Sequence, residues 1–445
     1  MRQCEFLLPA GIGLWLLAVS CHVSATASLA PPSPMRELLV AAGIHDDQWA
    51  GIRDGEPMSP AEERIVWHIL FRLPQVSLQS VETWSKAADW SAIREQPTAH
   101  RGDLYQIAGR GERLATISVP GDDSEAWGIG KYYRLEVRLD GPLPRAVVFA
   151  KSVPGNWQPL ADGGTSLNTP ISAHAVFLKL EMDDQGQAVP TFVASSIAWH
   201  PSQVSETLGV SESHVLLAGL GMDLRLLDDV HDRRGLLAED REGFYRLLAA
   251  VDRIEPADLS RRVDKDTELR LLLDRQEYPR QRGELVALTG NVKRAIRITV
   301  EGEDIVERLG FDHYYELNIF LDESVQLKRR ADDQDPLLYP RYPVVCCVRS
   351  LPPGMPEGDE VDEAVRVIGF FFKLYGYETQ YTNAQSGEPR QLSPLLVAPS
   401  PIWYARQSPS TFGWELAWGS GFVFAVAAIW WFVWRFHRDD VSRRR

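Results

Sequence analysis

Residues 101–121, RGDLYQIAGRGERLATISVPG, recur as residues 282–302, RGELVALTGNVKRAIRITVEG. The two stretches align without a gap at an offset of 181 positions (282 − 101), and Arg, Gly, Leu, Gly, Arg, Ile, Val and Gly recur at matching places. Self-similarity at a fixed offset indicates that one structural unit is used twice. The duplication therefore sets the domain plan, and each copy serves as an internal control for the other.

The similarity extends on both sides of these stretches. Upstream, residues 38–43 align with 216–221 at an offset of 178 (216 − 38). The sequence Ser59-Pro60-Ala61-Glu62 predicts a helix start with an N-cap, a proline at the first turn and a capping box. A further helix is expected over 257–273, with a weaker counterpart over 76–88. Downstream, Tyr-Tyr pairs, Leu-Asp pairs and Lys-Leu runs recur in both copies, which indicates a repeated β region.

Each copy has its helical part first and about six strand-like runs after it, an α+β order without β-α-β alternation. Gly109 and Gly290 lie near the middle of the first long strand, where a glycine permits a bend. A coiled sheet that closes on itself resembles an OB-like barrel, and an open β-sandwich is the alternative. The predicted fold is a tandem duplication of a small helical segment followed by an antiparallel sheet of this kind, plus one C-terminal transmembrane helix.

The predicted segments follow from this plan. They are a signal peptide (1–27), the helical segment (35–98) and β domain (99–202) of the first copy, the helical segment (211–280) and β domain (281–405) of the second, a transmembrane helix (414–435) and a basic cytoplasmic tail (436–445).

Both ends of the chain indicate a membrane-anchored protein. Arg2, an apolar run and small residues up to Ala27 predict a secretory signal, with lipidation of Cys21 as an alternative. Residues 416–434 carry no charge over 19 positions and would span about 28 Å as a helix. Five arginines follow the span, so the positive-inside rule places the tail in the cytoplasm and the rest outside. We therefore expect a single-pass protein of the cell membrane with extracytoplasmic N-terminal domains.

Small residues recur every four positions within the predicted span, at Ala417, Gly421 and Ala425. Such a row lets two helices approach closely. We expect the lipid bilayer as one partner, and either self-association through this face or a protein partner as another.

Charge and cysteine usage argue against several classes. The net charge is −14 despite the basic tail, and no dense Lys/Arg stripe with interleaved aromatics is present, so nucleic-acid binding is not expected. Cys346 and Cys347 are the cysteines outside the signal. They replace Val148 and Phe149 of the first copy, which predicts two core residues pointing to opposite faces of a strand.

No catalytic, cofactor or metal motif is found. The sequence lacks HExxH, GxSxG, CxxC and a phosphate-binding loop. Gly128-Ile129-Gly130-Lys131 is interpreted as a loop before a strand. His-Asp neighbours and Asp-Asp pairs do not recur between copies and suit surface turns. We assign no catalytic residue, no cofactor and no metal ligand.

Polar and aromatic residues shared by both copies form the one candidate binding face: Arg101, Arg282, Tyr133, Tyr315, Lys179, Lys373, Trp199 and Trp403. Arg113/Arg294 and Asp140/Asp322 are also shared. The competing interpretation is that these residues stabilise the fold through ion pairs and a tryptophan that closes the barrel.

A signal, a duplicated OB-like ectodomain and a C-terminal span together resemble uncharacterised bacterial single-pass membrane proteins. That resemblance implies no activity. The sequence favours a non-enzymatic binding or scaffolding module in the cell envelope, held by its anchor. The alternative of a different class is a hydrolase of envelope glycans or peptides with dispersed carboxylates, for which paired carboxyls about 5–10 Å apart would be needed.

Overall fold

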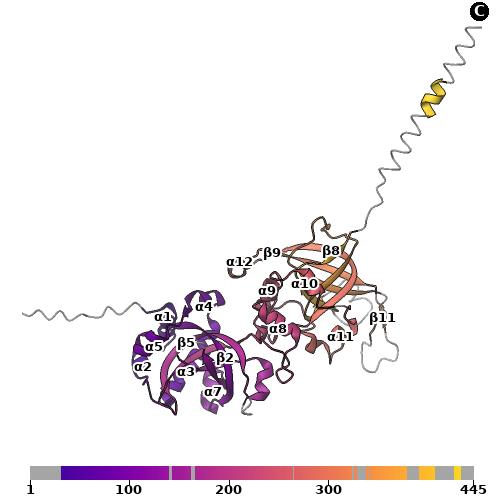
Figure 1. Cartoon of the computed structure of the whole chain (residues 1–445). Helices are drawn as coiled ribbons and strands as arrows, with labels where there is room; N and C mark the ends of the chain where they lie inside the picture. Colours follow the sequence, from indigo (N-terminus) through magenta and orange to yellow (C-terminus); the bar gives the residue numbers. More distant parts are fainter. Residues whose placement is uncertain are drawn as a thin grey trace, which may run out of the picture.

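The structure is a computed structural model, and it describes residues 32–139, 143–161, 166–263, 265–322, 325–327, 337–339, 341–377, 390–405 and 425–431. Two copies of a helical segment and a barrel follow each other along the chain (Figure 1). The first copy occupies the indigo and purple part of the picture, and the second barrel is orange.

The first copy begins with helices. They are α1 (Pro34–Ala41), α2 (Asp46–Ala50), α3 (Pro60–Arg72), η1 (Leu73–Gln75), α4 (Leu78–Trp84), α5 (Trp90–Glu95) and α6 (Pro97–His100). The start of α3 has the predicted capping box, in which Ser59 accepts from the Glu62 backbone N–H and the Glu62 side chain accepts from the Ser59 N–H. Ile65, Ile69 and Leu70 are buried on this helix, so it packs against the barrel as an amphipathic layer.

Five strands of the first copy form a closed barrel. The strands are β2 (Leu104–Ser118), β3 (Lys131–Leu139), β4 (Arg145–Ser152), β5 (Thr169–Met182) and β6 (Ala188–Ser196), with β1 (Lys86–Ala87) and β7 (Ala198–Trp199) added at the margins; α7 (Gly121–Trp127) and η2 (Gly155–Leu160) lie in the connections. The hydrogen-bonded order is β2-β3-β4-β6-β5, and β5 pairs with β2 to close the sheet.

The second copy repeats this sequence of elements. Its helices are α8 (Glu212–Gly219), η3 (Leu224–Leu227), α9 (Asp240–Val251), α10 (Pro256–Ser260), α11 (Leu269–Leu273) and η4 (Tyr278–Gln281); its strands are β8 (Leu285–Thr299), β9 (His313–Leu321), β10 (Val325–Leu327), β11 (Leu337–Tyr339), β12 (Tyr342–Val348), β13 (Glu363–Tyr377), β14 (Gln391–Ala398) and β15 (Ile402–Tyr404), with α12 (Glu303–Leu309) after β8. Its closed order is β8-β9-β12-β14-β13.

The two barrels match strand for strand and irregularity for irregularity. The register shifts in β2 before Arg113 and in β8 before Arg294, and again in β5 before Lys179 and in β13 before Lys373. An α+β fold with a closed five-stranded sheet, consistent with an OB-like barrel, is therefore confirmed. The open-sandwich alternative does not fit a sheet whose first and fourth strands pair.

Two details of the prediction were wrong. The sheets are mixed, not purely antiparallel, because β4 pairs with β6 and β12 with β14 in parallel. A closed barrel brings the last strand beside the third, and in this connectivity both run the same way. The helix expected over 257–273 is two short helices, α10 and α11, separated by irregular chain.

Glycines permit the close packing of the first two strands. A Cβ on Gly109 would lie 2.3 Å from the Arg138 carbonyl oxygen, and a Cβ on Gly290 would lie 2.6 Å from that of Phe320. The predicted glycine positions are thus points of close backbone approach, where no other residue fits without displacing the neighbouring strand.

Hydrophobic packing links the copies. The first barrel's interior, with Phe177, Phe192 and Trp157, belongs to one continuous cluster with Leu217 and Phe244 of the second copy's α8 and α9. Figure 1 shows α8 and α9 between the two barrels. The second barrel's interior is a separate cluster.

Ion pairs add to this contact. Glu82 of α4 pairs with Arg246 of α9 and, at 3.3 Å, with Arg308 of α12, which is almost fully buried and also pairs with Glu242 at 2.7 Å. These glutamates raise the pKa of the Arg308 guanidinium, chiefly through the Glu242 hydrogen bonds. Charged side chains from both copies thus meet at one junction.

Several sequence predictions lie outside the described residues. They concern the signal peptide (1–27), Cys21, Asp140, Ala417, Gly421, the tail (436–445) and most of the expected span. Within the expected span, residues 425–431 are helical and Ala425 is exposed. None of the helices in the described part of the chain combines the length and the apolar character needed to cross a bilayer.

Candidate functional site

A buried ion pair anchors the helical segment to the barrel in each copy. Lys179, the residue at the β5 bulge, is fully buried and donates to Glu62 Oε1 at 2.9 Å. Burial alone would raise the pKa of Glu62, but hydrogen bonds from the Ser59 and Arg53 backbone and from Lys179 outweigh it and lower that pKa. In the second copy Lys373 donates to Asp240 Oδ2 at 2.5 Å, and both are fully buried. The carboxylates are 178 positions apart (240 − 62), the offset expected from sequence.

A second pair repeats beside the first. Arg101 donates to Asp54 Oδ2 at 2.6 Å, while Asp54 Oδ1 accepts from the Leu180 backbone N–H at 2.9 Å. In the second copy Arg282 pairs with Asp232, which accepts from the Leu374 N–H at 2.8 Å. We call these four ion pairs the clamps. They fix helices α3 and α9, and the loop before each of them, to the strands that carry the bulge lysines, β5 and β13.

The aromatic members of the predicted face are also structural. Tyr133 is buried in the first barrel, and Tyr315 is partly buried against the second barrel's core. Trp199 Nε1 donates to Thr169 at 3.0 Å, and Trp403 Nε1 donates to Glu363 at 2.8 Å. Each tryptophan thus closes its barrel at the start of the fourth strand.

The eight shared residues therefore do not form an exposed face. Lys179 and Lys373 are fully buried and Arg101 is 4 % exposed, so a ligand cannot reach them. Their contacts agree instead with the interpretation that these residues stabilise the fold. The shared Arg113, interpreted from sequence as scaffold, lies elsewhere and lines a cavity.

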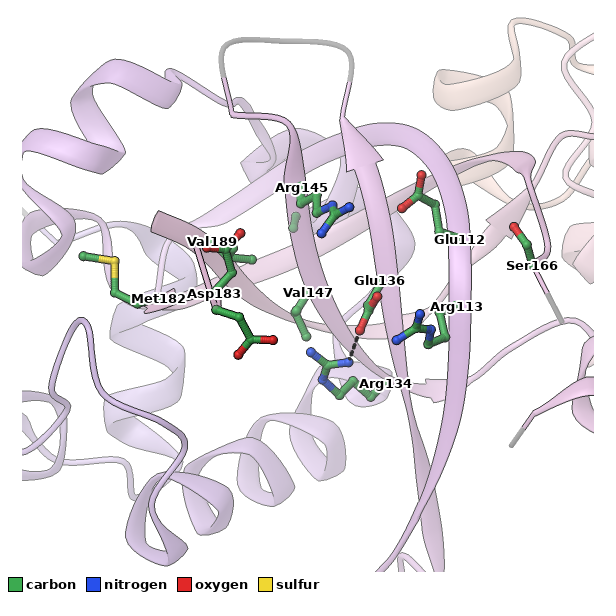
Figure 2. A pocket seen from close by; sticks show the side chains of 12 residues that line it. Glu112, Arg113, Arg134, Glu136, Arg145, Val147, Ser166, Met182, Asp183 and Val189 are labelled. Carbon is green, nitrogen blue, oxygen red and sulfur yellow. Dashed lines mark hydrogen bonds and ion pairs between the residues drawn. The ribbon is translucent and has the colours of Figure 1, made fainter. Parts of the chain in front are cut away.

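A groove of about 590 Å³ lies on the outer face of the first barrel (Figure 2). The β2 bulge, β3, β4, the β5–β6 hairpin and the segment before β5 contribute to it. Its lining is Glu112, Arg113, Arg134, Glu136, Arg145, Ala146, Val147, Ser166, Met182, Asp183, Asp184 and Val189. No aromatic side chain is among these residues. We call this cavity the first-barrel groove.

Most carboxylates of the first-barrel groove are already engaged. Glu136 accepts from Arg134 at 2.7 Å, and Glu112 lies 3.4 Å from Arg138. Asp183 Oδ1 accepts from two backbone N–H groups of its own hairpin, at 2.9 and 2.8 Å. Asp184, exposed at the hairpin tip, is the remaining acid.

Two arginines of the groove have no partner among the residues that the structure describes. Arg113 lies opposite Glu136 on β3, and the bulge directs it to the groove face. Arg145 is exposed at the start of β4. Figure 2 shows Arg113 and Arg134 on either side of Glu136, with Arg145 at the far wall. The groove lining thus combines three arginines from β2, β3 and β4 with four carboxylates, Glu112, Glu136, Asp183 and Asp184.

Glu181 precedes the groove residue Met182 on β5. It pairs in register with Val189, a lining residue. Burial raises the pKa of Glu181, and the nearby Lys179 ammonium only partly offsets this effect. One of its oxygens, Oε1, is buried without a hydrogen-bond partner.

The same place on the second barrel is built differently. Its bulge arginine, Arg294, is bound by Asp359 at 3.0 Å and lies 3.4 Å from Glu316. By strand register Glu316 stands where the first copy has Arg134, and Pro343 stands where it has Arg145. The second barrel therefore lacks two of the three groove arginines and neutralises the third.

Cysteine and metal chemistry find no site in the described residues. Cys346 lies in the second barrel's interior and Cys347 under its helices, both buried, as predicted. Burial raises the pKa of each thiol. No group of three or more His, Cys, Asp or Glu side chains in the described ranges is arranged to hold a metal ion.

Comparisons with known proteins do not assign this chain to a family. No protein-family model and no curated protein matches the chain. One similar solved structure is the single-stranded DNA binding protein from Thermus aquaticus, at 8% identity and a TM-score of 0.15, covering 69% of this chain and 95% of that one. Another is the ADP-ribosylating toxin BECa of C. perfringens, solved with NADH, at 10% identity and a TM-score of 0.13, covering 85% and 99%.

The expectation that the chain does not bind nucleic acid is corrected by the first of these matches and is not retained. The acidic net charge argued against phosphate binding, but a net charge averages over the surface, and the first-barrel groove holds three arginines beside its four carboxylates. At a TM-score of 0.15 the match carries no argument for a particular ligand.

Proposed function

We propose that this chain is a membrane-anchored, extracytoplasmic binding module of the cell envelope, and that the first-barrel groove holds its partner. The observation that carries the proposal is the pair of unengaged arginines, Arg113 and Arg145, in a cavity large enough for a few residues of a ligand. Charged groups that the fold leaves unpaired in a cavity are a common sign of recognition.

The anchoring rests on the sequence of the C-terminal region. Residues 416–434 carry no charge and five arginines follow. Val426, Ile429 and Trp430 are exposed on the helical stretch 425–431, which suits contact with lipid. A Val204→Cys variant, 56 % exposed at the native residue, should react with a membrane-impermeant maleimide in spheroplasts. An Arg445→Cys variant should react only after permeabilisation, and the reverse pattern would reject this topology.

Site-specific photo-crosslinking tests the groove. Met182 and Val204 are both 56 % exposed, but only Met182 lines the groove. A photoreactive residue at 182 should give a reproducible cross-linked partner in native cells, while one at 204 should not. The Arg113→Gln/Arg145→Gln variant should abolish the product from 182. Equal products from both positions, or persistence in the arginine variant, would reject the groove as the binding site.

The hydrolase alternative has one observation in its favour, the raised pKa of Glu181 beside the groove. A carboxyl of this kind can serve as a general acid. Labelled envelope fragments incubated with the chain test this alternative. Turnover that is lost in Glu181→Gln but kept in Asp184→Asn would replace binding by catalysis as the function.

A further inference from the structure

A serine and a histidine of the first copy meet on the outer face of the first barrel. Ser172 lies on β5 between Ile171 and Ala173, which belong to the barrel interior, so alternation along the strand places its hydroxyl outside. His200 directly follows β7, the short strand that pairs with β5 at this point. Ser172 Oγ lies 3.0 Å from His200 Nε2, and neither residue lines the first-barrel groove. We infer that Ser172 is the nucleophile and His200 the general base of a site that hydrolyses small carboxylic esters, an activity beyond the proposed binding function.

The hydrogen bond on the other side of the imidazole decides the direction of proton transfer. His200 Nδ1 lies 3.2 Å from the Met222 carbonyl oxygen, which can only accept. The neutral imidazole therefore carries its hydrogen on Nδ1, and Nε2 is left to accept from the Ser172 hydroxyl. Ser172 makes no other side-chain hydrogen bond to a described residue. A serine beside a base, with a third group that orients the base, is the arrangement that activates a hydroxyl as a nucleophile.

Further contacts hold the imidazole in this position. The His200 N–H donates to the Pro170 carbonyl oxygen at 3.1 Å, which ties it to β5. The preceding N–H, of Trp199, donates to Asp223 Oδ1 at 2.8 Å, so the chain is also tied to the segment that carries the Met222 carbonyl. Asp223 interacts electrostatically with His200 as well. A carboxylate there favours the imidazolium that forms when the hydroxyl gives up its proton.

The surroundings of Ser172 leave its hydroxyl approachable. Its neighbours in register are Ala108 of β2, which is exposed, and Ala198 of β7. Such small side chains admit a substrate but cannot enclose a long acyl chain, so we expect a small acyl group. An ester suits this site better than an amide, because its carbonyl carbon is more electrophilic and an alcohol leaves more readily than an amine.

The barrel fold does not require this pair. The second barrel has Arg366 at the position of Ser172 and Tyr404 at that of His200, as the pairing of β15 with β13 shows. The same barrel is thus built without the serine and without the histidine.

A second serine–histidine contact in the first copy provides a matched control. Ser85 Oγ lies 2.7 Å from His174 Nδ1, but it donates to the Val81 carbonyl oxygen at 2.6 Å. Its proton is therefore engaged by the helix, and His174 is left to donate to the hydroxyl oxygen. Ser85 should not be activated.

The reaction needs only water as a second reactant. Ser172 Oγ bonds to the acyl carbon and its proton passes to His200 Nε2. The bond from the acyl carbon to the alcohol oxygen then breaks, and the alcohol leaves with that proton. Water attacks the acyl–Ser172 ester and gives a proton to His200 Nε2, which returns it to Ser172 Oγ as the carboxylic acid leaves.

A fluorophosphonate carrying a fluorophore tests the inference on the detergent-solubilised full chain. Ser172 Oγ should displace fluoride and form a stable phosphonate ester, which peptide mass spectrometry can locate. Ser172→Ala should abolish the label, and His200→Gln should slow labelling on the order of a hundredfold or more. Ser85→Ala should label like the parent. The parent should also hydrolyse p-nitrophenyl acetate, and Ser172→Ala should lose this turnover.

Three outcomes overturn the inference. They are an unlabelled parent, a label on a residue other than Ser172, and an undiminished labelling rate in His200→Gln. Circular dichroism of each variant should match the parent, and Ser172→Ala removes only a hydroxyl whose described side-chain partner is His200. Cross-linking at position 182 reports on the groove, so its result is independent of this one.

Discussion

The two barrels share a scaffold and differ at one outer face. In both copies a bulge lysine and a loop arginine form the clamps, Lys179 and Arg101 in the first, Lys373 and Arg282 in the second. At the groove position the copies diverge, since the second copy has Glu316 at the position of Arg134 and Pro343 at the position of Arg145. The clamps common to both copies fix each helical segment to its barrel. Arg134 and Arg145 are private to the first copy, and with the shared Arg113 they line the groove where we propose that it binds.

The clamps should show the largest effect, and it should be equal in the two copies. Lys373→Met leaves Asp240 buried without its cation, and Lys179→Met does the same to Glu62. Breaking a buried pair from one side costs about 3–5 kcal/mol. Urea unfolding of each variant measures the loss. The double variant Lys373→Met/Asp240→Leu should recover much of it, and a negligible loss in either single variant would contradict the structural role.

The glycines of the first strands come next. Gly109→Ala and Gly290→Ala each press a Cβ against a carbonyl oxygen of the adjacent strand. Overpacking of this kind costs about 1–3 kcal/mol. Gly111→Ala is the matched control, because its Cβ would meet nothing nearer than 3.5 Å. Thermal unfolding that ranks Gly111→Ala with the other two would show that the close approach is not limiting.

The bulge arginines should separate the copies. Arg294→Gln removes the partners of Asp359 and Glu316 at a partly exposed site, where such pairs contribute up to about 1 kcal/mol. Arg113→Gln removes no hydrogen bond or ion pair to a described residue and should change stability by less than about 0.5 kcal/mol. Equal losses in urea unfolding would mean that Arg113 has a structural partner.

Glu181 should give the smallest effect, and its sign depends on pH. Burial raises the pKa of Glu181 in the folded state, so its ionised form destabilises the fold above that pKa. Below the pKa that Glu181 has in the unfolded chain, the folded and unfolded states both carry its proton, so the cost of burying the ionised carboxylate disappears. Glu181→Gln should therefore be slightly more stable than the parent at pH 7 and no different near pH 3. A variant that is less stable at pH 7 would contradict this reasoning.

The repeat carries most of what sequence reasoning could predict. The offset of 181 located the first strands, and Lys179 and Lys373 were predicted as shared residues, but Asp240 was not predicted as the counterpart of Glu62. Helix α7, with sequence GDDSEAW, was missed because seven residues with two apolar side chains show no periodicity. The parallel pairing of β4 with β6 is equally invisible, since it follows from closure of the barrel and not from any local pattern.

The groove escaped prediction for a related reason. Arg113, Arg134 and Arg145 come from three strands, and only the barrel brings them to one face. Arg101 and Lys179, which have counterparts in the second copy, form clamps, because an ion pair needed for folding recurs in each copy. Two groove arginines, Arg134 and Arg145, are instead replaced at the matching positions of the second copy, by Glu316 and Pro343.

The continuous core of the first barrel and helices α8 and α9 also bears on how the molecule can be divided. Trp157 and Trp199 meet edge to face at the barrel end, where the Trp199 N–H donates to Asp223 and the Gly155 N–H donates to Asp228 of the second copy. A fragment cut between the copies would expose this surface to water. We therefore expect the two copies to unfold together, as a cooperative unit larger than the one duplicated in the sequence, and protease digestion of the native chain to spare the junction.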